Sequence, residues 1–123
     1  MNRAFIIGHV TKDAETRPVN VKGIPTLVTD FTVAANEGYG ENQTTAYYRV
    51  SIWRDRGAKM APHLVKGRAV AVTGTPSVRA WKDNNGDPRA QLEMTNPTVE
   101  FIGKKPSDPD DLPFAAEGVE EEA

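Results

Sequence analysis

The sequence contains no cysteine and only two histidines among its 123 residues. Without cysteine there is no disulfide framework and no thiolate metal site, and the histidines have no Glu at metal-ligand spacing. No apolar run approaches the roughly 18 residues of a membrane-spanning helix. Charge at Lys12 and Asp13 interrupts the N-terminal apolar patch too early for a secretory signal. We therefore expect no metal site and no membrane partner, a pattern typical of a cytosolic protein.

Catalytic motifs are also missing. There is no G-x-S-x-G sequence and no cysteine nucleophile, and the glycines at 38 and 40 lack the third glycine and following helix of a phosphate-binding loop. Asp13 and Glu15 stand two residues apart, a spacing that is far more often a solvated turn than an acid/base pair. The sequence predicts a protein that is not an enzyme and carries no cofactor.

Basic residues are missing from the C-terminal segment. Residues 1–105 contain 15 Lys and Arg against 10 Asp and Glu, whereas residues 106–123 contain 7 acids and no base. The Pro- and acid-rich segment has too few apolar residues to offset the conformational entropy of folding. We expect one folded domain at 1–103, followed by a short linker and a disordered acidic tail at 104–123.

Alternating and β-branched residues dominate the body and predict five strands. The clearest is 26–35, in which apolar and polar side chains alternate as in a half-buried strand. Gly8 is expected to be a bulge or a close approach, Gly74 and Pro76 to mark a bend, and Asn85-Gly86 to form a hairpin turn. The full set of predicted strands is 3–10, 26–35, 44–53, 68–81 and 89–102.

Only residues 54–67 have helical spacing of apolar residues, with Gly67 at the expected C-cap. Pro62 predicts that this helix is short or kinked. Five strands with one short helix between the third and fourth predict an all-β fold, a five-stranded OB-fold barrel. Such barrels commonly bind oligonucleotides.

Aromatic residues fall into two groups. Tyr47, Arg49 and Trp53 occupy odd positions of one predicted strand, so they share a face and form a stacking platform for unpaired bases if that face is exposed. Burial in the core is an equal alternative for this set. Tyr39 and Trp81 lie in polar surroundings that favour ligand contact. Core positions are predicted for Phe5, Phe31 and Phe101.

Several segments together resemble one family. They are "MNRAFIIGHVTKDAE", "DFTVAANEGY" and the stretch from "TTAYYRVSIW" to "RAWKDNNG". In order and spacing they are similar to the single-stranded DNA-binding proteins of bacteria and their phages. The resemblance implies base-stacking roles for Tyr39, Tyr47, Trp53 and Trp81. It implies DNA-backbone contacts for Arg3, Arg49, Arg79 and Lys82, and a homotetramer, or at least a dimer, built partly through the first strand.

The tail segment "DPDDLPF" resembles the acidic tip with which family members dock on replication, recombination and repair proteins. The residues concerned are Asp108, Asp110, Asp111, Leu112, Pro113 and Phe114. In the family the Phe is normally the last residue, whereas here Phe114 is followed by nine more. Because the linker is short, we also hypothesise that the tail competes with DNA for the basic face of its own subunit.

The function predicted from all these features is binding and protection of single-stranded DNA without sequence preference, in the cytoplasm of a bacterium or of a phage host. Three alternatives remain open. They are a primosome-type OB adaptor, an RNA-binding OB module, and an oligomeric scaffold with buried aromatic residues and no strong binding of single-stranded DNA.

Overall fold

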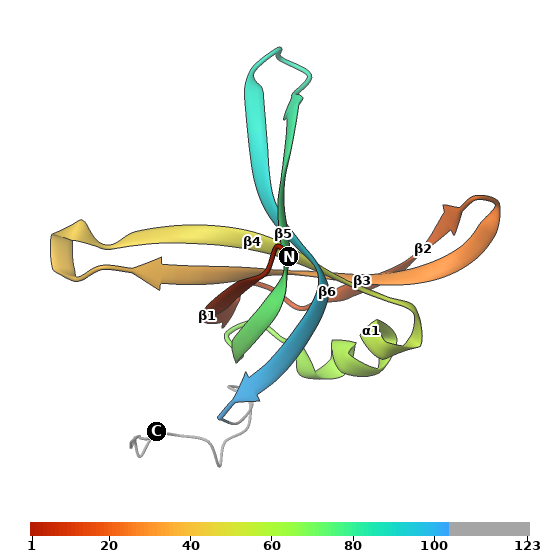
Figure 1. The fold of residues 1–123 in the computed structure, drawn as a ribbon, viewed down its shortest axis with the longest axis horizontal. Coiled ribbons are helices and arrows are strands. Elements are labelled where there is room, and N and C mark those ends of the chain that lie inside the picture. The colour runs from red at the N-terminus through yellow and green to blue at the C-terminus, as the bar shows by residue number, and fades with distance from the viewer. Residues whose placement is uncertain (104–123) are drawn as a thin grey trace.

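A computed structural model describes residues 1–103, so the predictions for the tail lie outside the described residues. These residues form six strands and one α-helix (Figure 1). The strands are β1 (Ala4–Val10), β2 (Glu15–Val21), β3 (Ile24–Glu37), β4 (Thr44–Trp53), β5 (Ala69–Lys82) and β6 (Pro88–Ile102), and the helix is α1 (Arg54–Met60). Short 3-10 turns lie at Gly40–Asn42 and Ala61–His63.

The strands form one sheet in the order β1-β5-β6-β4-β3-β2, and pairing of β1 with β3 closes it into a barrel. Five strands complete the barrel, and β2 pairs only with β3 at the end of the sheet. All strand pairs are antiparallel except β4 with β6. The predicted five-stranded OB barrel, with a helix after its third strand, is confirmed.

The core fills the barrel interior with side chains from β1, β3, β4, β5 and β6 and from the segment after α1. Its buried members are Val10, Phe31, Val33, Val50, Ile52, Leu64, Val70, Val72 and Met94. Phe31 was correctly assigned to the core, and Phe101 packs half-buried against it. The prediction for Phe5 is wrong: 61% of this residue is exposed. Successive strand residues face opposite sides, and the inward positions of β1 belong to Ile6, Gly8 and Val10.

Two glycines behave as predicted. A Cβ on Gly8 would lie 2.2 Å from the carbonyl oxygen of Ala34, so β1 crosses β3 at a distance that only glycine permits. The register of β5 and β6 shifts between Thr73 and Thr75, which places the irregularity at Gly74.

The predicted short helix is confirmed, but it covers only the first half of 54–67. The α-helix ends at Met60, and Pro62 follows in the 3-10 turn, because proline lacks the amide hydrogen of a longer helix. Gly67 is therefore not the helix C-cap. It has a positive φ of 87° just before β5, and its amide donates to the carbonyl of Val10.

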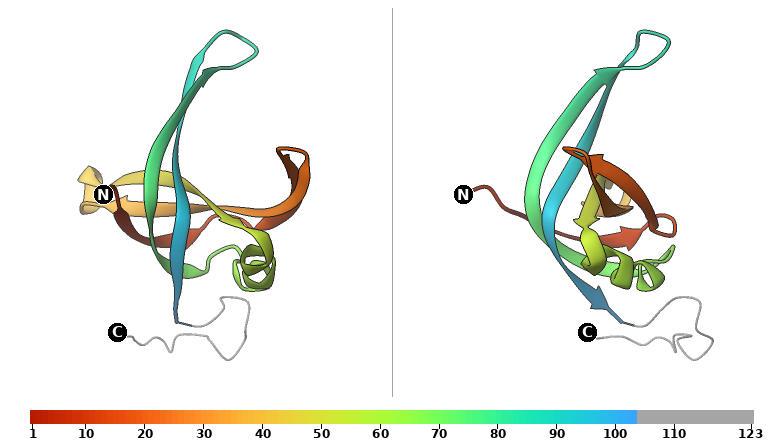
Figure 2. Two further views of the ribbon diagram at one scale, coloured as in Figure 1. Left: turned by 45° about the vertical axis from the view of Figure 1, so that its right-hand side comes forward. Right: turned by 90° about the vertical axis from the view of Figure 1, so that its right-hand side faces the viewer.

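Three hairpins extend beyond the barrel (Figures 1 and 2). The β5–β6 hairpin projects away from the barrel, and its predicted turn is confirmed at residues 83–87. The Asp83 carboxylate accepts the amide hydrogens of Asn85 and Asp87, and Gly86 takes a φ of 81°.

The β2–β3 hairpin was not predicted. Lys22 and Gly23, with φ of 52° and 81°, form its two-residue turn. Glu15, assigned to a solvated turn, is instead the first residue of β2. Among residues 1–103 no helix is long and apolar enough to cross a membrane.

Candidate nucleic-acid interface

The outer face of β4 carries the predicted row of Tyr47, Arg49 and Trp53. Tyr48, Val50 and Ile52 alternate with them and point toward the core. Tyr47 is 54% exposed and Trp53 41% exposed, so both rings are open to a ligand. The alternative in which this set belongs to the core of the subunit is therefore wrong.

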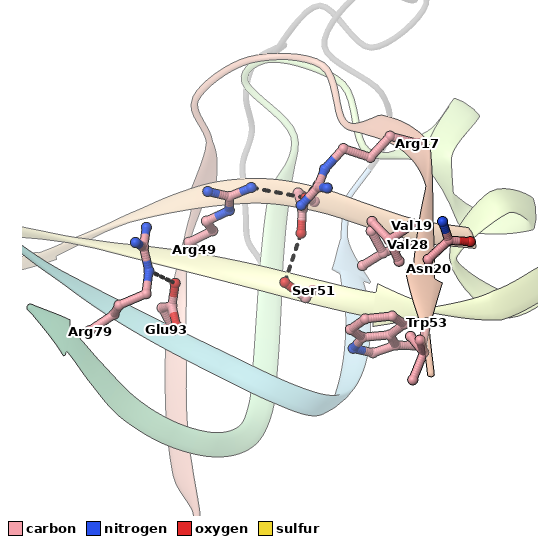
Figure 3. Close-up of a pocket in the computed structure, with 11 residues that line it drawn as sticks. Arg17, Val19, Asn20, Val28, Arg49, Ser51, Trp53, Arg79 and Glu93 are labelled. Carbon is pink, nitrogen blue, oxygen red and sulfur yellow. Dashed lines mark hydrogen bonds and ion pairs between the residues drawn. The ribbon is translucent and has the colours of Figure 1, made fainter. Parts of the chain in front are cut away.

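Arg49 and Trp53 of this row, with residues of the neighbouring strands, line a shallow cleft of about 380 Å³ (Figure 3). The register places Arg49 opposite Glu93 of β6, and Glu93 opposite Ser77 of β5. Arg79, two residues after Ser77, therefore reaches the same cleft as Arg49 and Trp53. Cations from two separate hairpins thus line the same cleft as the Trp53 ring.

Asp30 pairs with two arginines of this cleft, Arg49 and Arg17. Its Oδ2 atom is 3.0 Å from Nη2 of Arg49 and 3.1 Å from Nη2 of Arg17, and its Oδ1 accepts the Ser51 hydroxyl at 2.7 Å. Burial raises the pKa of Asp30, but hydrogen bonds from Ser51 and Arg49 and the positive charges of both arginines outweigh it, so the net pKa lies below its usual value. The carboxylate stays ionised and holds both guanidinium groups in place.

Arg79 is held by two neighbours. Its Nε donates to Oε2 of Glu93 at 3.1 Å, and its guanidinium lies 4.3 Å from the centre of the Trp81 ring. This cation–π contact orients the Trp81 ring on the β5–β6 hairpin, where 39% of the residue is exposed.

Of the predicted DNA-contact residues, only Arg49, Trp53 and Arg79 line the cleft, and the others, Tyr47 and Trp81 included, lie outside it. Tyr39 is 92% exposed in the β3–β4 connection, and Lys82 is exposed at the end of β5. The guanidinium of Arg3 donates to the Thr75 hydroxyl at 3.3 Å and to the carbonyl of Asn96 at 3.4 Å. Arg3 therefore ties the N-terminus to the start of the β5–β6 hairpin.

The sequence reasoning missed Arg17, Val19 and Val21, which β2 contributes to the cleft. The signal was present, because these residues alternate with Pro18 and Asn20 and precede a Lys-Gly turn. Among the described residues no group of three or more acidic or histidine side chains could hold a metal ion.

The sequence pattern of the Single-strand binding protein family matches residues 1–102. The chain belongs to this family. A "Single-stranded DNA-binding protein" of Caldanaerobacter subterraneus subsp. tengcongensis is 35% identical over 109 residues, which are 85% of this chain and 70% of that protein. Another, from Thermotoga maritima, is 30% identical over 112 residues, or 87% and 77% of the two chains.

Among solved structures, "Plasmodium falciparum SSB complex with ssDNA" superposes with a TM-score of 0.67 at 23% identity. The match covers 83% of this chain and 95% of that one. At this identity the likeness concerns the fold, and it agrees with the OB barrel found here.

Proposed function

We propose that this member of the family binds single-stranded DNA without sequence preference and protects it during replication, recombination and repair. The observation that carries the proposal is the exposed row of Tyr47, Arg49 and Trp53 beside the cations of the cleft. Each base stacked on an aromatic ring contributes about 1–3 kcal/mol, and guanidinium groups bind any phosphate. The names of the relatives and the DNA in the Plasmodium complex support the same ligand.

The proposal includes the sites predicted from the sequence. Tyr39, Tyr47, Trp53 and Trp81 stack on bases, while Arg3, Arg49, Arg79 and Lys82 contact phosphates. The absence of sequence preference is supported by the chemistry of the cleft, since ring faces accept any base. Within residues 1–103 the one α-helix has seven residues and packs on β3 and β4, so it is not available to read a DNA groove.

We also propose that the chain acts as a homotetramer or dimer. Phe5 and Ile7 on β1 are 61% and 55% exposed, an unusual state for neighbouring apolar residues on a strand. A second copy that covers this face of β1 removes both side chains from water. Sedimentation of the unmodified protein and of the Ile7→Ser variant tests the proposed oligomer. If both sediment with the mass of one subunit, the proposal is wrong.

Residues 1–103 are the proposed DNA-binding domain, and the acidic segment at 108–114 is the proposed docking site for replication, recombination and repair proteins. The proposed place of action is the cytoplasm. No catalytic role is assigned to the protein.

The intrinsic fluorescence of Trp53 and Trp81 tests the central proposal, because they are the only two tryptophans in the chain. Titration with oligo(dT) should quench the emission, and raising the salt concentration should weaken the binding. A matched duplex should have little effect. The variants Trp53→Phe and Trp81→Phe show which ring reports the binding.

The same titration distinguishes the alternatives. Preference for oligo(U) over oligo(dT) would indicate an RNA-binding module. Binding that does not increase with oligonucleotide length would favour a primosome-type adaptor. Unchanged emission and no complex with any strand would refute DNA binding and leave the scaffold interpretation.

A further inference from the structure

The β2–β3 hairpin leaves one edge of β2 without a partner. In the sheet order β2 comes last, and among residues 1–103 no strand pairs with its other edge. The hairpin extends beyond the barrel (Figure 1), and its apolar residues Val21, Ile24 and Leu27 are 42%, 65% and 37% exposed. An unpaired strand edge beside exposed apolar side chains is a template for pairing with another chain.

The turn of the hairpin determines which backbone groups point to this edge. Lys22 and Gly23 have φ of 52° and 81°, the positive values of a type I′ turn, which is closed by a hydrogen-bonded pair of the flanking residues. That pair is Val21 and Ile24. Because hydrogen-bonded and non-hydrogen-bonded pairs alternate along an antiparallel ladder, residues 15, 17, 19 and 21 bond to β3. The backbone groups of residues 16, 18 and 20 therefore point to the free edge.

Two prolines agree with this alternation. Pro18 pairs with Leu27, and Pro25 pairs with Asn20, and both are non-hydrogen-bonded pairs in this ladder. The opposite alternation would place both prolines where the ladder needs an amide hydrogen, which proline lacks. Pro18 thus leaves the pairing of β2 with β3 intact and stands at the middle of the free edge.

Pro18 removes the central hydrogen-bond donor of that edge. The remaining outward amides belong to Thr16 and Asn20, which are four residues apart and therefore separated by about 13 Å. A strand added here would lose a ladder hydrogen bond at its centre and meet the proline ring instead. The strand at the other end of the sheet order, β1, contains no proline between Ala4 and Val10.

We infer that Pro18 blocks the edge of β2 against pairing with the same edge of a second copy, and so restricts association of this chain to the exposed face of β1. The block itself follows from the backbone geometry, whereas the role of β1 rests on the proposed homotetramer or dimer. If copies could pair at both ends of the sheet, they would link into open chains instead of a closed oligomer.

Hydrogen exchange tests the backbone geometry. The amides of Arg17 and Val19 should exchange slowly because they bond to β3, whereas those of Thr16 and Asn20 should exchange fast. In dilute solution, the amide that Pro18→Thr introduces should exchange as fast as that of Thr16. Slow exchange of Thr16 and Asn20 together with fast exchange of Arg17 and Val19 would overturn the alternation.

Sedimentation over a range of concentrations tests the block. Pro18→Thr should form species larger than the unmodified protein, in amounts that increase with concentration. Asn20→Thr is the matched control, because it places the same side chain on the same face of β2 at a position that already has an outward amide. The double variant Pro18→Thr/Asn20→Pro moves the proline two residues along the edge and should return the mass to that of the unmodified protein. Circular dichroism verifies that each variant is folded.

The two hypotheses fail in different ways. If Pro18→Thr keeps the mass of the unmodified protein at every concentration, or if Asn20→Thr associates to the same extent, Pro18 does not block the edge and the inference is refuted. If the unmodified protein has the mass of one subunit, the proposed oligomer is wrong, and the comparison of Pro18→Thr with Asn20→Thr still decides whether the edge is blocked.

Discussion

The spacing of Tyr47 and Trp53 makes a quantitative prediction for DNA affinity. The two residues are six positions apart on one strand face, and a rise of about 3.3–3.4 Å per residue separates them by about 20 Å. One base cannot contact both rings across that distance. Each ring should therefore stack on a different nucleotide.

Tyr47→Ala and Trp53→Ala should each lose about 1–3 kcal/mol of binding free energy for each subunit engaged. This corresponds to a decrease in affinity of about 5- to 140-fold. Because sites more than 7–10 Å apart act independently, the loss in the double variant should equal the sum of the two single losses within about 0.5 kcal/mol.

Fluorescence anisotropy of a labelled oligo(dT) short enough for one subunit measures these affinities without relying on tryptophan emission. Val78→Ala is the matched control, because Val78 is 65% exposed but points away from the face that carries Arg79 and Trp81. A double variant no weaker than either single variant would refute the reasoning, since it would mean that both rings act on one base or on the fold.

Three further predictions concern the fold, the Asp30 carboxylate and the tail. Gly8→Ala should lower the melting temperature by several degrees, because its Cβ meets a backbone oxygen at 2.2 Å and such overpacking costs about 1–3 kcal/mol. Gly74→Ala, whose Cβ has its nearest atom at 3.0 Å, should lower the melting temperature less. A larger decrease for Gly74→Ala than for Gly8→Ala would contradict the packing argument. Asp30→Asn should melt below the unmodified protein at neutral pH. The pKa of Asp30 is lowered from 3.8, so the ionised carboxylate stabilises the fold above pH 3.8, and this stabilisation is lost as the pH falls through the lower pKa of the folded state. If Asp30→Asn still melts below the unmodified protein in acid, the ion pairs are not the cause of the difference. Truncation after Ser107 should raise the affinity for oligo(dT) at low salt, and unchanged affinity would exclude competition between tail and DNA.

Periodicity predicted the barrel strands because each has one face in the core. In β4, Val50 and Ile52 turn inward while Arg49 and Trp53 turn outward, and the predicted range 44–53 matches Thr44–Trp53. The same rule could not place Phe5. It stands in the run Phe5-Ile6-Ile7, which is apolar on both faces, and a period of two gives no orientation there. Covering by a second copy would explain why both faces of β1 are apolar.

The strand β2 escaped prediction for the opposite reason. It pairs only with β3, most of its residues are exposed, and it contributes no side chain to the buried core. Its Pro18 also weakened the strand signal, although proline is tolerated on an edge strand. The alternation of Arg17, Val19 and Val21 was the remaining evidence for a strand. Their common place in the cleft with Trp53 becomes evident only from the folded hairpin.

Ion pairing was the part of the site that composition could not reveal. The partners of Asp30 are 13 and 19 residues away in the sequence, so only the register of β2, β3 and β4 brings them together. As a result, the three arginines of the cleft are accompanied by two carboxylates, Asp30 and Glu93. A count of basic residues therefore overstates the charge that DNA meets there. We expect phosphates to join these pairs at the exposed side of each guanidinium, and the salt dependence of binding to be weaker than the number of cations on this face suggests.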